Sequence, residues 1–279
     1  MSDRYAVLGN PVAHSRSPDI HAAFARQTGQ DIEYGRLLCP LDGFEAAVRE
    51  FAAGGGRGCN VTLPFKFEVP RLAARCSDRA RLAGAANTLR FDAAGWFADN
   101  TDGIGLVRDI EHGAGVPLAG RRVLLVGAGG AGAGVLGPLL AARPAEVVVA
   151  NRTLDKAHAL VSRHVSWARE HGVRLAASAL ERPGDAFDVV VNASASSLQG
   201  LSSPVPPEVL GAGALAVDLM YGAAAAPFLA WARAAGATAR DGLGMLVEQA
   251  AESFHIWRGV RPLTAPVLLA LCASLAAAP

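Results

Sequence analysis

The chain has 279 residues, a formal net charge of +1 at pH 7 and hydrophobic side chains at 51% of its positions. This length suits one large domain or two ordinary ones, and either buries a sizeable core. The charge is near neutral, and basic residues neither cluster nor alternate with aromatic ones, which argues against a nucleic-acid partner.

We expect no membrane span, no export signal and no metal site. The longest apolar stretch, 265–279, is interrupted by Pro266 and is too short to cross a bilayer, so it predicts a packed terminal helix. The amino terminus lacks the apolar core of a signal peptide. The four cysteines have neither CxxC pairs nor metal-binding histidine spacing, which predicts buried thiols in a reducing cytoplasm and no disulfide framework.

The amino-terminal part of the chain alternates short apolar runs with helical stretches. The runs at 5–8, 32–38 and 58–62 predict strands, and helical stretches follow at 18–28, at 43–53 and up to Gly84. Such alternation predicts a parallel sheet covered by helices. Ser17 before Pro18 predicts an N-cap followed by a proline in the first helical position. A turn at 93–95 and the run 96–103 predict a hairpin that leads into another helix.

Beyond residue 113, a segment of linker composition (113–120) precedes a second set of strands and helices. Apolar runs recur at 123–126, 147–150, 173–177, 187–193 and 214–220, the strand pattern of a dinucleotide-binding domain. Thr153 is the expected N-cap of the helix after the second of these strands. A glycine-rich point at 241–244 then precedes two long helices.

The sequence VLLVGAGGAG at 123–132 indicates the ligand of this second region. Gly127 and Gly129 allow a tight turn and bring bare backbone against a pyrophosphate, while Gly132 lets the next helix pack closely. The amino end of that helix would hold the anion. About 20 residues further on, where NAD sites usually carry an acidic residue, the chain has Arg152, whose guanidinium suits the 2′-phosphate of NADP.

Polar residues gather where loops should follow strands, at 14–18, 60–66, 84–88 and 100–103. Together they supply hydroxyls, amides, an amine and an acid, which suits a small, heavily hydroxylated ligand. Each also has a structural explanation when taken alone. Serines cap helices, asparagine and threonine close turns, lysine is usually solvated, and an aspartate at a helix start serves as an N-cap.

The motifs GNPVAHSRSP, NVTLPFK, GAANT, NTDG, VGAGGAG, NRT and DGLGMLVEQA occur in this order between residue 9 and about residue 258. In this the chain resembles the shikimate dehydrogenase family, and seven ordered motifs are far more specific than any one of them. The resemblance implies NADPH-dependent reduction of 3-dehydroshikimate to shikimate, in the pathway to aromatic amino acids.

The resemblance also implies the roles of individual residues. Lys66 and Asp102 would form the catalytic pair. The substrate's carboxylate and hydroxyls would be held by Ser15, Ser17, Asn60, Thr62, Asn87, Tyr221 and Gln249, with Lys66 and Asp102 also in contact. Hydride addition to a ketone builds an alkoxide, which needs a proton and nearby positive charge, and a lysine ammonium offers both. Asp102 would position Lys66, and which of the two formally transfers the proton stays open.

For NADP, the resemblance implies contacts from Gly127, Ala128, Gly129, Gly130, Ala131, Asn151, Arg152, Thr153, Lys156, Leu219 and Gly242. Lys156 stands where the family often has arginine; together with Asp155 beside it, this predicts somewhat softer discrimination for NADP. Asp78 is a weaker candidate on the cofactor side.

The family architecture implies an α/β protein of two domains with a cleft between them. A substrate-binding domain would comprise 1–104 plus 243–279, and a Rossmann-type NADP-binding domain would comprise 105–242. Two alternatives stay open: a quinate or dual-specificity quinate/shikimate dehydrogenase, and a catalytically silent NADP-dependent regulatory binding protein. Retention of both Lys66 and Asp102 argues against the silent protein. The chain would act as a monomer or a homodimer, and no membrane partner is expected.

Overall fold

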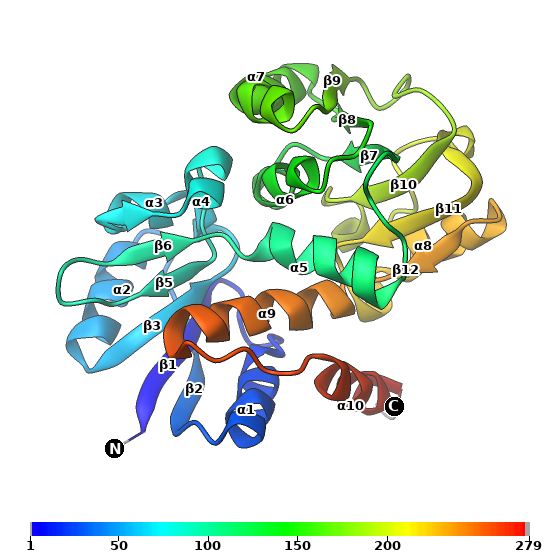
Figure 1. The fold of residues 1–279 in the computed structure, drawn as a ribbon. Coiled ribbons are helices and arrows are strands. Elements are labelled where there is room, and N and C mark those ends of the chain that lie inside the picture. Colours follow the sequence, from blue (N-terminus) through cyan, green and yellow to red (C-terminus); the bar gives the residue numbers. More distant parts are fainter. Residues whose placement is uncertain (1, 277–279) are drawn as a thin grey trace. The chain divides into compact units, whose positions relative to one another are not determined.

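The computed structural model describes residues 2–276, and the chain forms two compact units (Figure 1). Unit 1 comprises Met1–Gly105 and Val247–Pro279, and unit 2 comprises Leu106–Leu246. Each unit contains one six-stranded sheet. Within residues 2–276, no helix combines the length and the apolar character that a bilayer crossing requires.

The sheet of unit 1 has the order β2-β1-β3-β5-β6-β4. Its strands are β1 (Asp3–Gly9), β2 (Ile32–Leu38), β3 (Gly56–Val61), β4 (Arg75–Cys76), β5 (Thr88–Arg90) and β6 (Phe97–Asp99). β1 pairs in parallel with both β2 and β3, as the alternating pattern predicts, whereas β5 pairs antiparallel with β3 and β6. The turn at 93–95 is too short for a crossover helix, so β5 and β6 form the predicted hairpin.

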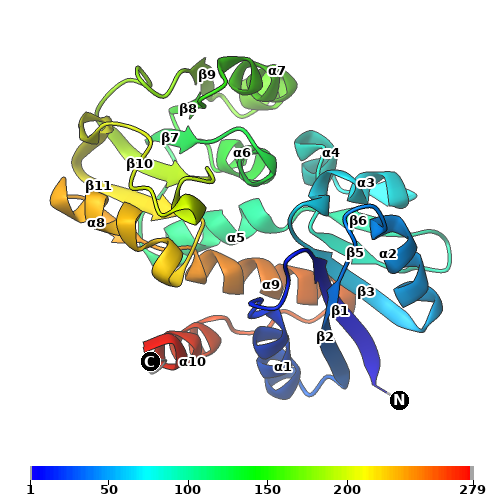
Figure 2. The same cartoon turned by 180° about the vertical axis from the view of Figure 1, so that it is seen from behind.

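Most helices of unit 1 cover this sheet, and the last of them packs on the first (Figure 2). They are α1 (Ser17–Thr28), α2 (Phe44–Ala53), the short 3₁₀ turn η1 (Phe65–Phe67), α3 (Val69–Leu72), α4 (Asp78–Ala83) and α10 (Ala265–Ala276). Two further helices, α5 (Asp102–Arg108) and α9 (Leu243–Arg258), run from residues of one unit into residues of the other. One core cluster joins Leu8 of β1, Phe44 of α2 and Phe65 of η1, all fully buried or nearly so.

The prediction that Ser17 caps α1 is wrong. The helix already includes Ser17, Arg16 occupies the N-cap position, and no side chain caps the helix. Pro18 does lie in the first turn, as predicted. The Ser17 side chain is buried and interacts with the phenol of Tyr34 instead. This side chain is therefore available to a site rather than to the helix end.

The sheet of unit 2 is entirely parallel and has the order β12-β11-β10-β7-β8-β9. Its strands are β7 (Arg122–Val126), β8 (Glu146–Ala150), β9 (Arg174–Ser178), β10 (Phe187–Asn192), β11 (Leu210–Asp218) and β12 (Thr238–Arg240). The first three strands run outward in one direction and the last three in the other, which is the doubly wound dinucleotide-binding order. Its switch point lies between the neighbours β7 and β10.

The helices of unit 2 pack on this sheet. They are α6 (Gly130–Ala141), α7 (Leu154–Glu170) and α8 (Ala226–Ala234), with a π-helical turn η2 (Asp109–Gly113) and short 3₁₀ turns η3 (Ser197–Gln199), η4 (Pro207–Val209) and η5 (Gly222–Ala224). The segment 113–120 lies inside unit 2 and is not a linker between units. Its Leu118 is fully buried, so an apolar anchor overrides the linker composition.

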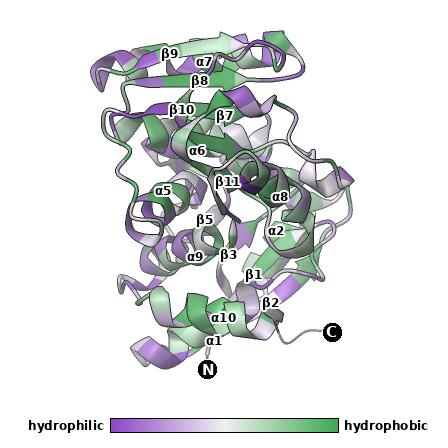
Figure 3. Ribbon diagram, turned by 90° about the vertical axis from the view of Figure 1, so that its right-hand side faces the viewer, coloured by the Kyte–Doolittle hydropathy of each residue, from purple (hydrophilic) through white to green (hydrophobic). Residues whose placement is uncertain are grey.

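The terminal helix α10 is mostly hydrophobic (Figure 3) but only partly packed. Val267 and Leu271 are buried, whereas 72% of Leu269 is exposed. The prediction of a terminal helix is therefore confirmed for Ala265–Ala276, and the remainder of the stretch, 277–279, lies outside the described residues.

Candidate active site

Lys66 and Asp102 meet in unit 1, although 36 residues separate them in the chain. Lys66 Nζ lies 2.6 Å from Asp102 Oδ2, and only 17% and 7% of the two side chains are exposed. Lys66 sits in η1, just after Pro64, and Asp102 is the first residue of α5. The Asp102 carboxylate therefore faces the lysine and does not cap α5. Such a desolvated pair holds the amine at a fixed place.

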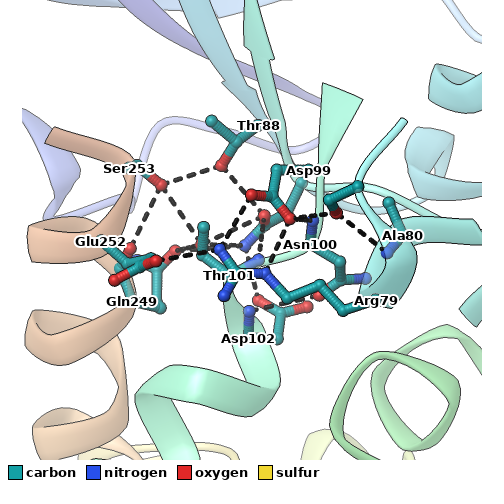
Figure 4. A network of polar contacts seen from close by, with 12 residues as sticks. Arg79, Ala80, Thr88, Asp99, Asn100, Thr101, Asp102, Gln249, Glu252 and Ser253 are labelled. Atoms are coloured by element: carbon teal, nitrogen blue, oxygen red, sulfur yellow. Dashed lines mark hydrogen bonds and ion pairs between the residues drawn. The ribbon is translucent and has the colours of Figure 1, made fainter. Parts of the chain in front are cut away.

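Asn87 fixes the second oxygen of the same carboxylate. The Thr101 backbone N–H donates to Asn87 Oδ1 at 2.9 Å, so the amide nitrogen must face the other way. That nitrogen donates to Asp102 Oδ1 at 2.8 Å and to Gln249 Oε1 at 3.2 Å. Both oxygens of Asp102 are therefore held, one by Lys66 and one by Asn87. Gln249 joins the same network from α9 (Figure 4).

Asn60 belongs to this network through a residue that the sequence did not single out, Ser253. Asn60 Nδ2 donates to the Ser253 hydroxyl at 3.0 Å and to the Thr88 hydroxyl at 3.1 Å. The Ser253 hydroxyl also lies 3.2 Å from that of Thr101. Ser253 is fully buried one helical turn after Gln249, and its contact with Asn60 spans 193 residues. Helical spacing on α9 is the signal that could have found it.

A second residue missed from the sequence is Tyr34 of β2. Burial raises its pKa well above the usual value, so the phenol stays protonated and donates to Asn60 Oδ1 at 2.7 Å. The phenol interacts with Ser17 as well, and the His21 ring stacks on that of Tyr34 with the centroids 4.2 Å apart. Tyr34 thus connects two predicted substrate ligands, one from α1 and one from β3.

A buried ion cluster supports the loop that carries Thr101 and Asp102. Arg79 donates to both oxygens of Asp99, at 2.7 and 2.8 Å, and to Glu252 at 3.0 Å. Asp99 Oδ1 also accepts the backbone N–H of Asn100 at 2.7 Å. The cluster fixes the backbone just before the carboxylate of Asp102 (Figure 4).

The remaining predicted substrate residues fall into two groups. Ser15 and Thr62 are half-buried in unit 1; the Ser15 hydroxyl accepts the Ser17 N–H at 3.3 Å, and the Thr62 methyl packs against Gly9. Tyr221 lies in unit 2, at the start of η5. The network of Ser17, Asn60, Lys66, Asn87, Asp102 and Gln249, completed by Tyr34, is continuous within unit 1.

The glycine turn of unit 2, residues 127–132, leaves no room for a side chain at Gly127 or Gly132, whereas Gly129 faces open space. Gly127 has φ of +111°, and a Cβ there would lie 2.8 Å from the Ala193 carbonyl oxygen. A Cβ on Gly132 would lie 2.1 Å from the Gly127 carbonyl oxygen. Next to the turn, the Ala128 N–H donates to Asn151 Oδ1 at 3.1 Å. Bare backbone therefore lines the amino end of α6, beside Gly129, Gly130 and Ala131.

The side chains after β8 are open to solvent. Arg152, Thr153 and Lys156 are exposed, and over residues 2–276 neither basic side chain forms an ion pair or hydrogen bond. Thr153 occupies the N-cap position of α7, as predicted, but its hydroxyl caps nothing. At the other side of the sheet, a Cβ on Gly242 would lie 2.3 Å from the Leu219 carbonyl oxygen.

The weaker cofactor candidate, Asp78, is exposed on α4 of unit 1 and pairs with Arg81. In the described part of the chain, no three His, Cys, Asp or Glu side chains gather as a potential metal site.

Comparison with known proteins shows the family of this chain. Three family profiles match: the shikimate dehydrogenase substrate binding domain at 7–89, shikimate/quinate 5-dehydrogenase at 111–203, and the shikimate 5′-dehydrogenase C-terminal domain at 242–271. A protein of Acidovorax sp. named shikimate dehydrogenase (NADP(+)) is 62% identical over 276 residues, covering 99% of this chain and 98% of that protein. The chain belongs to the shikimate dehydrogenase family.

Two further relatives agree with this assignment. A shikimate dehydrogenase (NADP(+)) of Methylibium petroleiphilum is 64% identical over 275 residues, covering 96% of this chain and 94% of that one. The crystal structure of shikimate 5-dehydrogenase from Thermus thermophilus, in complex with NADP(H) and shikimate, is 34% identical with a TM-score of 0.82, covering 96% and 98% of the two chains. The predicted α/β fold class is confirmed.

Proposed function

We propose that this chain catalyses the reversible, NADPH-dependent reduction of 3-dehydroshikimate to shikimate. The relatives with more than 60% identity are named for this dehydrogenase activity with NADP(+). The observation that carries the proposal in this chain is the desolvated pair of Lys66 and Asp102, held among amides and hydroxyls. A protein that only sensed the cofactor would need no such pair.

When bound, NADPH supplies the hydride that reduces the ketone carbon. The ketone oxygen then gains negative charge, and the Lys66 ammonium stabilises it and donates a hydrogen bond or the proton. Asp102 keeps the ammonium in place through the 2.6 Å contact, while Asn87 prevents the carboxylate from rotating. In the reverse direction the same pair accepts the proton of the alcohol.

The surrounding side chains suit a small molecule with several hydroxyls and one carboxylate. Hydroxyls both donate and accept, so Ser15, Ser17 and Thr62 serve either kind of substrate group. The Asn60 side-chain oxygen accepts one hydrogen bond, from Tyr34, and can accept a second from the substrate. Gln249 closes the set from α9, and Tyr221 would contribute from unit 2.

Unit 2 fits NADP. The turn at Gly127 and the contact of Gly132 with it would present backbone N–H groups to a pyrophosphate, and a side chain at either position would distort the turn. Arg152 and Lys156 offer two unpaired positive charges at the end of β8, where a 2′-phosphate would lie. Leu219 and Gly242 would face the nicotinamide. Unit 1 would then serve as the substrate-binding domain and unit 2 as the cofactor domain.

The prediction of buried thiols holds for Cys39 and Cys59 but is wrong for Cys76, which is half-buried, and for Cys272, which is exposed. The four thiols are unbridged in the described residues, which supports a reducing cytoplasm as the place of action.

The test is to follow oxidation of NADPH, and separately of NADH, with 3-dehydroshikimate and with 3-dehydroquinate. We expect efficient turnover only with NADPH and 3-dehydroshikimate. Comparable turnover with 3-dehydroquinate would favour the dual-specificity enzyme, and no turnover with either substrate would favour the silent binding protein.

A further inference from the structure

The carboxylate of Asp218 is the most buried acidic group that the proposed chemistry does not use. It is the last residue of β11 and is completely buried. Within residues 2–276, no arginine, lysine or histidine forms an ion pair with it. Burial raises its pKa, and the surrounding donors offset this only in part. A buried carboxylate without a cationic partner is costly, so its presence here calls for an explanation.

The explanation lies in the three donors that converge on this carboxylate. Oδ1 accepts the Met220 backbone N–H at 2.8 Å. Oδ2 accepts the Ser197 hydroxyl and, at 3.1 Å, the amide Nδ2 of Asn192. An asparagine at position 218 would turn an N–H toward one of these donors, whereas a carboxylate only accepts. The site is therefore built for an acceptor.

Asn192, the last residue of β10, extends the contact toward the glycine turn. It is completely buried and pairs in register with Asp218 of β11 and with Val126 of β7. Its Oδ1 accepts the Ser194 N–H at 3.2 Å and the Ser194 hydroxyl at 2.7 Å. Ser194 follows Ala193, whose carbonyl lies where a Cβ on Gly127 would be. Asn192 thus lies at the switch point of the sheet.

The backbone at 219–220, directly after Asp218, is also held at this pair. The Leu219 N–H donates to the Asn192 carbonyl at 3.0 Å, and the Gly242 N–H donates to the Met220 carbonyl at 2.8 Å. The turn at 219–220 and the loop at 194–197 are consequently tied to one buried pair. In a doubly wound sheet the two halves of a dinucleotide lie on opposite sides of the switch point. Arg152 follows β8 on one side, and Asp218 ends β11 on the other.

From this geometry we propose that Asp218, together with Asn192, is a positioning residue for the nicotinamide half of NADP. It touches neither cofactor nor substrate; it holds the backbone of 194–197 and 219–220 in the shape that receives the nicotinamide. This inference rests on the proposed cofactor site, in which Leu219 and Gly242 face that ring. The adenosine half, held by Arg152 and Lys156, does not depend on the pair.

The test compares NADPH with 2′,5′-ADP, which carries only the adenosine half and the 2′-phosphate. In Asp218→Asn, the Kd and the KM for NADPH should rise about tenfold, since a buried hydrogen-bond partner is lost. The Kd for 2′,5′-ADP and the KM for 3-dehydroshikimate should stay within about twofold of wild type. In the exchange variant Asn192→Asp/Asp218→Asn, an amide N–H at position 218 again faces a carboxylate oxygen at position 192. This variant should recover most of the affinity for NADPH.

The matched control is Asp188→Asn at the start of the same strand β10, where the carboxylate accepts the Arg122 N–H at 2.8 Å. It removes a carboxylate near the amino end of β10, far from the carboxyl ends of the strands where NADP would bind. It should therefore leave NADPH binding unchanged. Should Asp218→Asn fail to fold, Ser197→Ala removes a single donor and carries the same comparison.

Unchanged NADPH affinity in Asp218→Asn, or an equal loss for NADPH and 2′,5′-ADP, would overturn the positioning role. Wild-type protein that binds neither compound would instead overturn the proposed cofactor site, and the inference with it.

Discussion

The two lysines of the chain have opposite environments, and this separates their expected roles. Lys66 is mostly buried against Asp102, whereas Lys156 is exposed. Lys66→Met should lower kcat about 10²- to 10⁴-fold with little change in the KM for NADPH, because the ammonium acts mainly in the transition state. Lys156→Met should raise the KM for NADPH and leave kcat nearly unchanged. Steady-state kinetics with 3-dehydroshikimate measures both; turnover by Lys66→Met near the wild-type rate contradicts the mechanism.

Arg152 should govern the choice between NADPH and NADH. Its side chain is exposed after β8, and a guanidinium binds a phosphate through two charge-assisted hydrogen bonds. Arg152→Ala should raise the KM for NADPH about 10- to 100-fold and leave the KM for NADH almost unchanged. Arg169→Ala, exposed at the carboxyl end of helix α7, is the control. An equal effect on both cofactors would show that Arg152 does not read the 2′-phosphate.

Single residues also show what sequence reasoning can and cannot supply. The catalytic role of Asp102 came from the resemblance of NTDG to the family motif, because its local position at a helix start predicts only an N-cap. Ser17 was expected as a cap on equally local grounds, yet its side chain turns to Tyr34. Ser253 has only a weak local signal, its helical spacing from Gln249, and Asp218 has none, because their partners are brought in by strands and helices distant in the chain.

At the scale of elements, periodicity predicted most strands and helices within a few residues. Counting apolar runs predicted five of the six strands of unit 2 and their dinucleotide-binding pattern, but it missed the short edge strand β12. The antiparallel hairpin and the burial of Leu118 depend on turn length and on a single anchoring side chain. Composition averaged over a window does not register either feature.

Helix α9 places Gln249 and Ser253 on one face, four residues apart. We therefore expect Ser253 to support the same network as Gln249. Ser253→Ala removes one buried hydrogen-bond partner from each of Asn60 and Thr88, so it should lower the free energy of unfolding by about 1–3 kcal/mol and raise the KM for shikimate. Urea unfolding and steady-state kinetics measure the two effects. Ser274→Ala, exposed on α10, should change neither quantity; a Ser253→Ala variant that matched it would contradict the network's role.

For the whole molecule, stability should fall as the pH drops below about 6.5, because both units bury a neutral histidine. Burial lowers the pKa of His164 in unit 2, and it lowers that of His21 in unit 1 to about 3, although nearby Asn60 offsets part of this. Unfolded chains bind the proton at about pH 6.5, so each histidine contributes stability at neutral pH that is lost progressively toward its lower native pKa.

The acidic groups with lowered pKa values, Asp3 and Glu252, lose their contribution only nearer to pH 4. Burial raises the pKa of Asp218, so this group gains stability as the pH falls, and the loss from about pH 6.5 to pH 5 comes from the histidines. In that interval the loss due to His21 approaches about 1.4 kcal/mol per pH unit. His21→Phe keeps a ring against Tyr34 and should flatten the dependence for unit 1. Urea unfolding at several pH values tests this, with exposed His158→Gln as the control. A dependence equally steep in His21→Phe and wild type would show that His21 is not its source.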